Sequence, residues 1–134
     1  MTTLLVDAAN VVGSRPDGWW RDRAGATSRL LARLAAVPGR ELALTDGAAV
    51  RCTTVVVVLE GQARDVPAPE GIEVVRAPGS GDDALVAAAG RLGEDLGEDV
   101  VAVTADRGLP ARLPAGTTVA GPGRLLAALD AIGA

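Results

Sequence analysis

The stretch that decides the fold is TLLVDAAN, residues 3–10. Its apolar half, Leu4 to Val6, predicts a short buried strand. Asp7 places a carboxylate where that strand ends, and Asn10 follows three residues later. These two polar residues could simply turn the chain and cap a helical turn. A carboxylate directly after a buried strand is poorly solvated, however, and favours a bound cation. We therefore interpret Asp7 as the first member of a shared acidic site.

Length and composition predict one domain, residues 1–134, with a core built from Ala, Val and Leu, because Phe and Tyr are absent. The apolar run Val55 to Leu59 is far shorter than the roughly 20 residues that a membrane-spanning helix needs. The N-terminal region lacks the pattern of a secretory signal. Cys52 is the only cysteine and cannot form an internal disulfide. We expect a soluble, cytoplasmic protein with no membrane partner.

The residue types that are missing limit the chemistry. The chain has no His, which excludes His-ligated zinc and serine triads, and it has no Lys, which excludes a P-loop lysine and a Schiff base. Carboxylates, hydroxyls, amides and arginines remain. Clustered carboxylates favour a hard divalent cation, Mg²⁺ or Mn²⁺. The net charge of −4 argues against binding nucleic acid by bulk attraction, although a bound cation would invert the sign of an acidic pocket.

Apolar runs that alternate with helical patterns predict an α/β fold. The strands are expected at residues 3–7, 53–59, 72–75, 99–104 and 117–120, and the helices at 22–36, 82–92 and 123–132. Residues 10–18 are predicted as a loop, residues 41–52 as a hairpin that turns at Asp46-Gly47, and a short helix could follow Asp106. Such alternation predicts three layers, with a central, mostly parallel five-stranded sheet covered on both faces.

Acidic side chains follow four of the five predicted strands. They are Asp7, Glu60, the pair Asp82 and Asp83, and Asp106. Parallel strands end at one edge of a sheet, where ligands bind near the switch point in strand order, so these acids are predicted to converge. The residues that follow the fifth predicted strand, 121–123, include no acid, as expected if that strand lies far from the site.

Each of these acids also has a structural interpretation. Ser80 as a helix N-cap would place Asp83 at the third helical position, which accounts for Asp83 and leaves Asp82 free for a metal ion. Asp106 could cap a short helix, and Glu60 could belong to a turn. Thr104 could orient a metal-bound water or bind phosphate through its hydroxyl.

The predicted entry to the first long helix is rich in arginine and contains both tryptophans. One of Trp19 and Trp20 is expected to pack on the core, and Trp20 is the candidate for stacking on a base. Phosphate contacts are predicted from arginines near the first strand's exit and opposite it; the candidates are Arg15, Arg21, Arg23 and Arg107. A solvated charged surface is the alternative.

Four motifs together resemble the NYN domain of the PIN-like nuclease superfamily. They are the D-x-x-N opening within residues 4–11, the entry Trp20…Asp22-Arg23, the stretch 81–85 and the stretch 103–107. The resemblance leaves out residues 38–53. It implies a compact PIN-like, Rossmann-like fold and Mg²⁺- or Mn²⁺-dependent phosphodiester hydrolysis, usually of RNA. Asp7, Asp82 and Asp106 would be catalytic metal-binding acids, with Asp83 in reserve, and Asn10 and Thr104 would support them.

The sequence therefore predicts a metal-dependent phosphodiester hydrolase, a ribonuclease. Water activated by the cation would attack in line, and Arg107 or Arg23 would stabilise charge on the phosphate. Two alternatives stay open: a hydrolase of nucleotides or other small phosphoesters that uses the same acids, and an RNA-binding or regulatory module without turnover. The expected partner is RNA or a nucleotide, and the chain could also form a homodimer.

Overall fold

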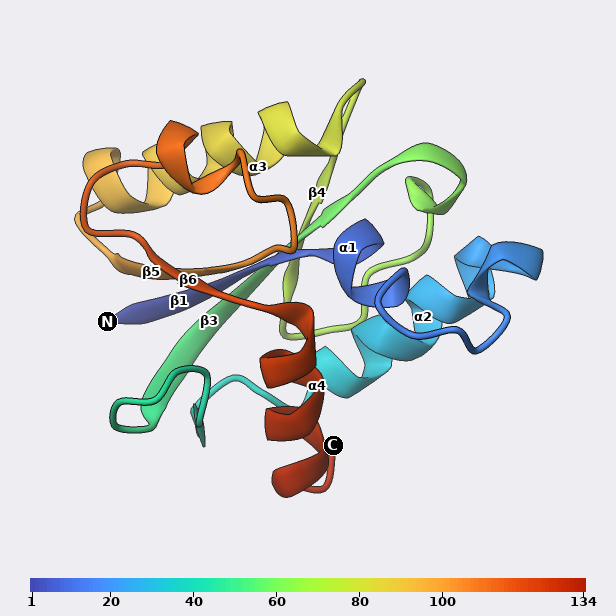
Figure 1. The fold of residues 1–134 in the computed structure, drawn as a ribbon, viewed down its shortest axis with the longest axis horizontal. Helices are drawn as coiled ribbons and strands as arrows, with labels where there is room; N and C mark the ends of the chain where they lie inside the picture. The colour runs from blue at the N-terminus through green and yellow to red at the C-terminus, as the bar shows by residue number, and fades with distance from the viewer.

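One six-stranded sheet organises the computed structural model, which describes residues 1–134 (Figure 1). The strands are β1 Thr2–Asp7, β2 Arg40–Leu42, β3 Val50–Leu59, β4 Glu73–Arg76, β5 Asp99–Val103 and β6 Thr118–Ala120. In the sheet they lie in the order β2-β3-β1-β5-β6. The remaining strand, β4, pairs with β3, as β2 also does. Every pairing is parallel except that of β2 with β3. The predicted α/β fold with a mostly parallel sheet is confirmed.

The strand count differs from the prediction because β2 adds a sixth strand to the five expected. β2 is only three residues long and pairs in antiparallel register with the start of β3, so that Leu42 faces Val50. The hairpin predicted within residues 41–52 is therefore present, with a loop that contains Asp46-Gly47. The start of β3 lies at Val50, three residues before its predicted position, because this pairing extends the strand.

The helices lie close to their predicted positions. They are α1 Ala8–Val12, α2 Arg23–Leu34, α3 Gly81–Gly90 and α4 Pro122–Ala131; a π-helical turn, Arg91–Asp95, extends α3. Short 3-10 turns lie at Trp19–Arg21, Gly61–Ala63 and Pro110–Arg112, and the last of these is the short helix expected after Asp106. The prediction of a loop over 10–18 was wrong at its start, because Asp7 caps α1 and the helix ends only at Val12.

Helices cover both faces of the sheet and create two apolar layers (Figure 1). On one face, Leu5 and Val56 pack with Leu85 of α3. On the other face, the alternate residues Leu4 and Val6 pack with side chains of α1, α2 and α4. Burial of one such aliphatic side chain contributes about 1.5–3 kcal/mol to stability. The sequences of the central strands are continuous apolar runs because both faces of these strands are buried in this way.

The order of the strands sets the position of the site. From β1 the chain moves to β3 and then outward to β4, after which α3 carries it back to β5 on the other side of β1. The strand order therefore reverses beside β1, and in open α/β sheets ligands bind at the carboxyl edge of this switch point. Asp7 is the last residue of β1 and lies at that edge. No helix of the structure is long and apolar enough to span a bilayer.

Candidate functional site

Asp7 is an almost fully buried carboxylate, with 2 % of its surface exposed. It caps α1 by accepting hydrogen bonds from the backbone N–H of Asn10, at 3.4 Å, and from the Asn10 side-chain amide. Burial raises the pKa of Asp7, and the nearby charge of Asp106 adds to that effect; hydrogen bonds from Asn10 and from the Thr104 hydroxyl oppose it. Asn10 therefore holds the Asp7 carboxylate through both its backbone N–H and its side-chain amide.

Thr104 joins the exits of β1 and β5. It is buried, and its backbone N–H donates to the carbonyl of Ala120 at 3.1 Å. Its hydroxyl donates to the Asp7 carboxylate and accepts the backbone N–H of Asp106 at 3.1 Å. One side chain thus sets the position of two of the predicted acids.

Asp82 and Asp106 form a hydrogen-bonded acid pair. Asp82 lies in the first turn of α3, and Asp106 follows β5. The pKa of Asp82 is raised to about 6, first by burial, then by the hydrogen bond to Asp106, and further by the charges of Asp106, Asp7 and Glu60. The pKa of Asp106 is lowered, mainly because its carboxylate accepts the backbone N–H of Gly108 at 2.9 Å. As pH falls, the pair therefore takes up its first proton on Asp82, near pH 6.

Glu60 belongs to the same group of acids. Its carboxylate lies over Gly81, the first residue of α3, where a Cβ atom would overlap it. Glycine at position 81 thus lets a negative side chain reach the positive end of the helix. The carboxylates of Asp7, Glu60, Asp82 and Asp106, which we call the acid cluster, lie close enough for Asp82 to be affected by the charge of the other three.

Asp83 interacts with Ser80 and Arg112 and not with the acid cluster. Its backbone N–H donates to the Ser80 hydroxyl at 3.4 Å, which confirms Ser80 as the N-cap of α3. Its carboxylate forms an ion pair with Arg112 at 2.7 Å. Of the two adjacent acids, Asp82 is therefore the one that faces the acid cluster, as the N-cap argument predicts.

The donor chemistry of the acid cluster fits a hard cation. Its ligands would be carboxylate oxygens, which Mg²⁺ and Mn²⁺ prefer. Burial is the main cause of the raised pKa values of Asp7 and Asp82, and repulsion between the carboxylates adds to it; a bound cation would oppose both effects by favouring the ionised forms. No three acidic or cysteine side chains are placed so that they could hold a metal ion as they stand. Asp82 and Asp106 bond to each other instead of converging with Asp7 on one point.

Comparison with solved structures places this arrangement in a known fold. The fold is similar to that of Rae1 (YacP) from Bacillus subtilis. The two share a TM-score of 0.70 and 18 % sequence identity over 99 % of this chain and 76 % of that one. A point variant of Rae1 gives a TM-score of 0.67 at 18 % identity, over 99 % of this chain and 77 % of the variant. No family model and no curated protein sequence matches the chain. At this identity the likeness shows the fold alone.

The predicted substrate-binding residues are dispersed around this Rae1-like fold. Trp20 is 51 % exposed, and the Arg21 guanidinium lies over its ring at 6.0 Å from the centroid. Arg23 lies instead over Trp19, at 5.3 Å, and Trp19 is the more buried of the two tryptophans. Each indole therefore carries a cation–π contact, and Trp20 keeps an exposed surface on which a base could stack.

Arg112 is a charged neighbour of the acids that sequence reasoning missed. It pairs with Asp83, and its charge helps to lower the pKa of Asp106. The predicted residue Arg107 is exposed and has no ion-pair or hydrogen-bond partner. Nothing in the sequence marks Arg112, because its position depends on the path of the loop after β5.

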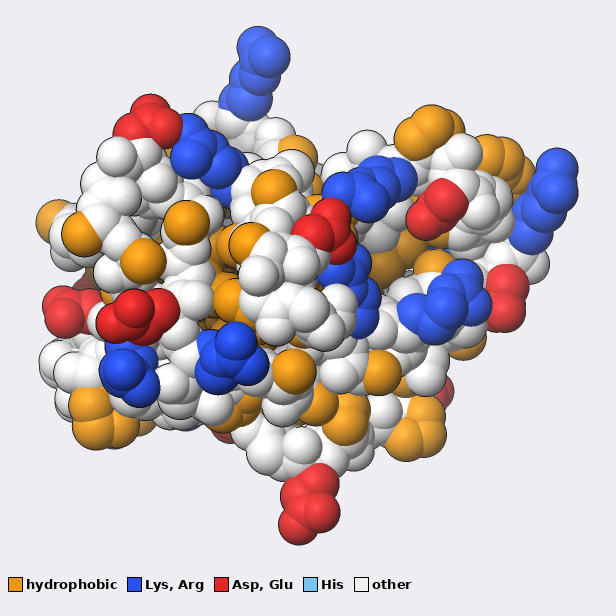
Figure 2. Space-filling model, turned by 90° about the horizontal axis from the view of Figure 1, so that it is seen from below, with side chains coloured by type: hydrophobic (Ala, Val, Ile, Leu, Met, Phe, Trp, Pro, Cys, Tyr) orange, Lys and Arg blue, Asp and Glu red, His pale blue; other side chains and the backbone are white.

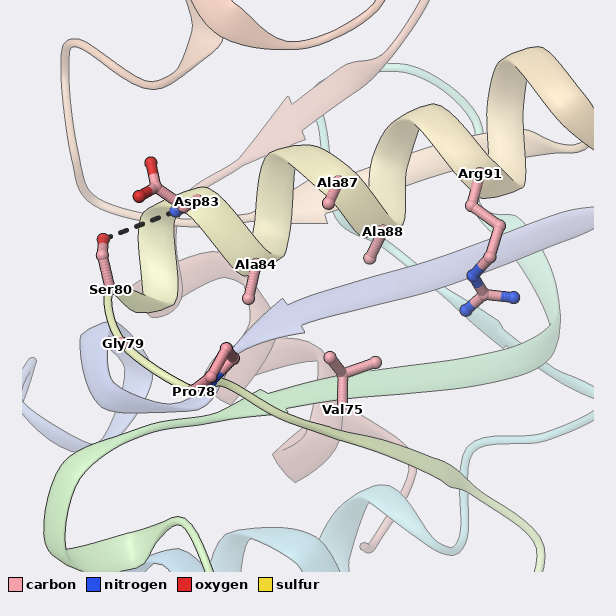
Figure 3. A pocket seen from close by; sticks show the side chains of 9 residues that line it. All are labelled: Val75, Pro78, Gly79, Ser80, Asp83, Ala84, Ala87, Ala88 and Arg91. Atoms are coloured by element: carbon pink, nitrogen blue, oxygen red, sulfur yellow. Dashed lines mark hydrogen bonds between the residues drawn. The ribbon is translucent and has the colours of Figure 1, made fainter.

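A hollow of about 550 Å³ lies between β4 and α3 (Figure 3). Its apolar wall contains Val75 and Pro78, together with small alanines of α3; Ser80 and Asp83 lie at one end and Arg91 at the other. Asp7, Asp82 and Asp106 do not line it. Of the predicted metal-binding acids, only Asp83 lines the hollow.

The raised pKa of Asp82 predicts a stability that depends on pH in the absence of metal. Between the ordinary value of 3.8 and about 6, the folded protein binds more protons at Asp82 than the unfolded chain does. The free energy of unfolding should therefore fall as pH rises through this range, and it should level off above it. Asp82→Asn should remove the contribution of Asp82 and make that slope shallower, and it should raise stability at neutral pH by about 1 kcal/mol or less, since the group is partly exposed and screened.

Denaturant unfolding in EDTA at several pH values from about 4 to about 7 measures this slope. Asp65→Asn, an exposed loop substitution without an ion-pair partner, is the matched control and should keep the wild-type slope. An Asp82→Asn protein with the wild-type pH dependence would show that Asp82 is not the group that holds the proton.

Proposed function

We propose that this chain is a metal-dependent phosphodiester hydrolase that acts on single-stranded RNA. One observation carries the proposal: Asp82 is affected by the charges of Asp7, Glu60 and Asp106, which come from three different strand exits and gather at the switch point of the sheet. Perturbed carboxylates gathered at the ligand edge of an α/β sheet are typical of a catalytic site. The motif resemblance to NYN domains and the Rae1-like fold support the same conclusion.

Asp7, Asp82 and Asp106 are the residues that would hold Mg²⁺ or Mn²⁺. When bound, the cation supplies a Lewis acid that lowers the pKa of water and neutralises charge on the phosphate. Asn10 and Thr104 orient the Asp7 carboxylate through their hydrogen bonds. Metal coordination by Asp82 and Asp106 would replace the hydrogen bond between them, and it would favour the ionised form of Asp82.

A hydrolase of nucleotides or small phosphoesters is the second candidate, and the charge of the surface favours it. Figure 2 shows arginine side chains interleaved with acidic ones over the face that carries α2 and α4, without one continuous positive stripe. The net charge is −4. A small substrate needs fewer phosphate contacts than a polynucleotide does. A binding module without turnover is the third candidate, since three acids do not converge on one point.

Cleavage assays with the purified chain and Mn²⁺ separate these candidates. We expect single-stranded RNA to be cut, EDTA to stop the reaction, and nucleoside triphosphates to persist. Hydrolysis of the triphosphates with intact RNA would favour the second candidate. Binding of RNA without cleavage of either substrate would favour the third.

A further inference from the structure

A second hollow, of about 240 Å³, lies between α1, α2 and α4, and we call it the α1–α2–α4 groove. Its lining is apolar at the centre and charged at the rim. The apolar residues are Val11, Val12, Ala26, Leu30 and Leu126, and the charged ones are Arg15, Asp17, Arg29 and Arg33. Figure 2 shows a hollow of this kind, with an apolar floor between arginine side chains, on the face that carries α2 and α4. Three of the 13 basic residues of an acidic protein thus surround one small cavity.

Two of these arginines are free to bind a ligand. Arg33 is already engaged, because its Nε–H donates to the backbone carbonyl of Ala134 at 3.0 Å and its guanidinium pairs with Asp130 at 2.5 Å. Arg15 and Arg29 are exposed and have neither a hydrogen-bond nor an ion-pair partner. The one acid at the rim, Asp17, is turned into its own loop, where it accepts the backbone N–H of Trp19 at 3.2 Å.

The α1–α2–α4 groove adjoins the acid cluster through a single short helix. Asp7 caps the N-terminus of α1, and Val11 and Val12 at its other end line the groove. A five-residue helix is about 7.5 Å long, so the two features lie about one and a half turns apart. A chain-like substrate bound at the acids would therefore reach the groove within a short distance.

The two kinds of lining match the two parts of a single-stranded nucleic acid. Unpaired arginines bind phosphate oxygens through charge-assisted hydrogen bonds, and an apolar floor accommodates bases and sugars. We infer that the α1–α2–α4 groove binds the RNA segment that flanks the scissile bond, with Arg15 and Arg29 as its phosphate ligands. The inference rests on the proposed function for its substrate class, and it adds a binding site outside the acid cluster.

The test measures binding without cleavage. The probe is a fluorescein-labelled single-stranded RNA of about 12 nucleotides, and anisotropy is followed in EDTA from about 50 to about 200 mM salt. For Arg15→Ala combined with Arg29→Ala, we expect the magnitude of the salt slope of log K to fall by about 1.4, because each phosphate contact on a single strand contributes about 0.7. Affinity at the lowest salt should fall about tenfold.

Arg40→Ala combined with Arg51→Ala is the matched control. It removes the same charge from β2 and the start of β3, at the opposite end of the strands from Asp7, and it should keep the wild-type slope. Because Arg51 also donates to the Gly39 carbonyl at 2.7 Å, circular dichroism checks that this control keeps its fold. An Arg15/Arg29 double variant whose slope and affinity equal those of the wild type or of this control would overturn the inference. So would a poly-glutamate peptide that binds more tightly than the RNA, since it would identify an acidic peptide as the occupant.

The cleavage assay keeps this inference separate from the proposed function. A slope that falls as expected in a protein that cuts no RNA would support the groove and contradict the hydrolase. Cleavage by a protein whose slope is unchanged in the double variant would support the hydrolase and overturn the groove.

Discussion

Replacing Asp7 by Asn is expected to lower metal-dependent RNA cleavage by about 1,000-fold or more, the effect of losing several kcal/mol of transition-state stabilisation by the metal. Asp7 is the most buried carboxylate of the acid cluster, and it lies at the switch point of the sheet. An amide cannot supply the anionic ligand that a hard cation prefers. The loss should appear in the rate at saturating Mn²⁺.

The fold of the Asp7→Asn protein should persist. Asparagine is as good an N-cap as aspartate, and it removes a carboxylate whose pKa is raised by burial. Circular dichroism and thermal unfolding in EDTA should therefore match or exceed the wild type. Asp65→Asn, on an exposed loop, controls for loss of one negative charge and should keep full activity. Full activity in Asp7→Asn would refute the metal-site assignment.

Replacing Thr104 by Val is expected to have the second largest effect, because one buried hydroxyl serves two acids. It donates to Asp7 and accepts the backbone N–H of Asp106. Valine keeps the shape but leaves both groups without this partner, which costs about 1–3 kcal/mol per unsatisfied buried group. We expect the free energy of unfolding in EDTA to fall by about 2 kcal/mol and cleavage to fall about tenfold or more, since Asp7 loses a bond that orients it.

Thr104→Ser separates the hydroxyl from the methyl group. Serine keeps the donor and acceptor, so cleavage should recover to within a few-fold of the wild type, while stability should still fall by about 1 kcal/mol for the lost methyl. The measurements are denaturant unfolding and initial cleavage rates on the three proteins. Equal losses of activity in Thr104→Val and Thr104→Ser would show that packing, and not the hydroxyl, is what the site needs.

The sheet could be predicted from the sequence because its strands are apolar runs with clear ends. The runs at residues 3–7 and 53–59 became β1 and the greater part of β3. The helix α1 was missed because five residues are too few to show a helical period, and only the cap formed by Asp7 reveals it. The strand β2 is three residues long and exists through its pairing with β3, which no local pattern encodes.

The positions of the acids were predictable for the same reason, because the exits of parallel strands share one edge. Asp7, Asp82 and Asp106 come from different parts of the chain and influence one another's pKa. The orientation of individual side chains was not predictable. The ion pair of Asp83 with Arg112 depends on the loop after β5, and the groove that holds Arg15 and Arg29 depends on how α2 packs against α1 and α4.

The most direct test of the metal-site account is a crystal structure of the chain soaked in Mn²⁺, examined by anomalous diffraction. We predict an anomalous peak bounded by carboxylate oxygens of Asp7, Asp82 and Asp106, with the hydrogen bond between Asp82 and Asp106 broken. The same soak of Asp7→Asn crystals should show a weaker peak or none. A wild-type crystal in which these three carboxylates hold no manganese at saturating concentration, and in which Asp82 and Asp106 remain bonded to each other, would contradict the account.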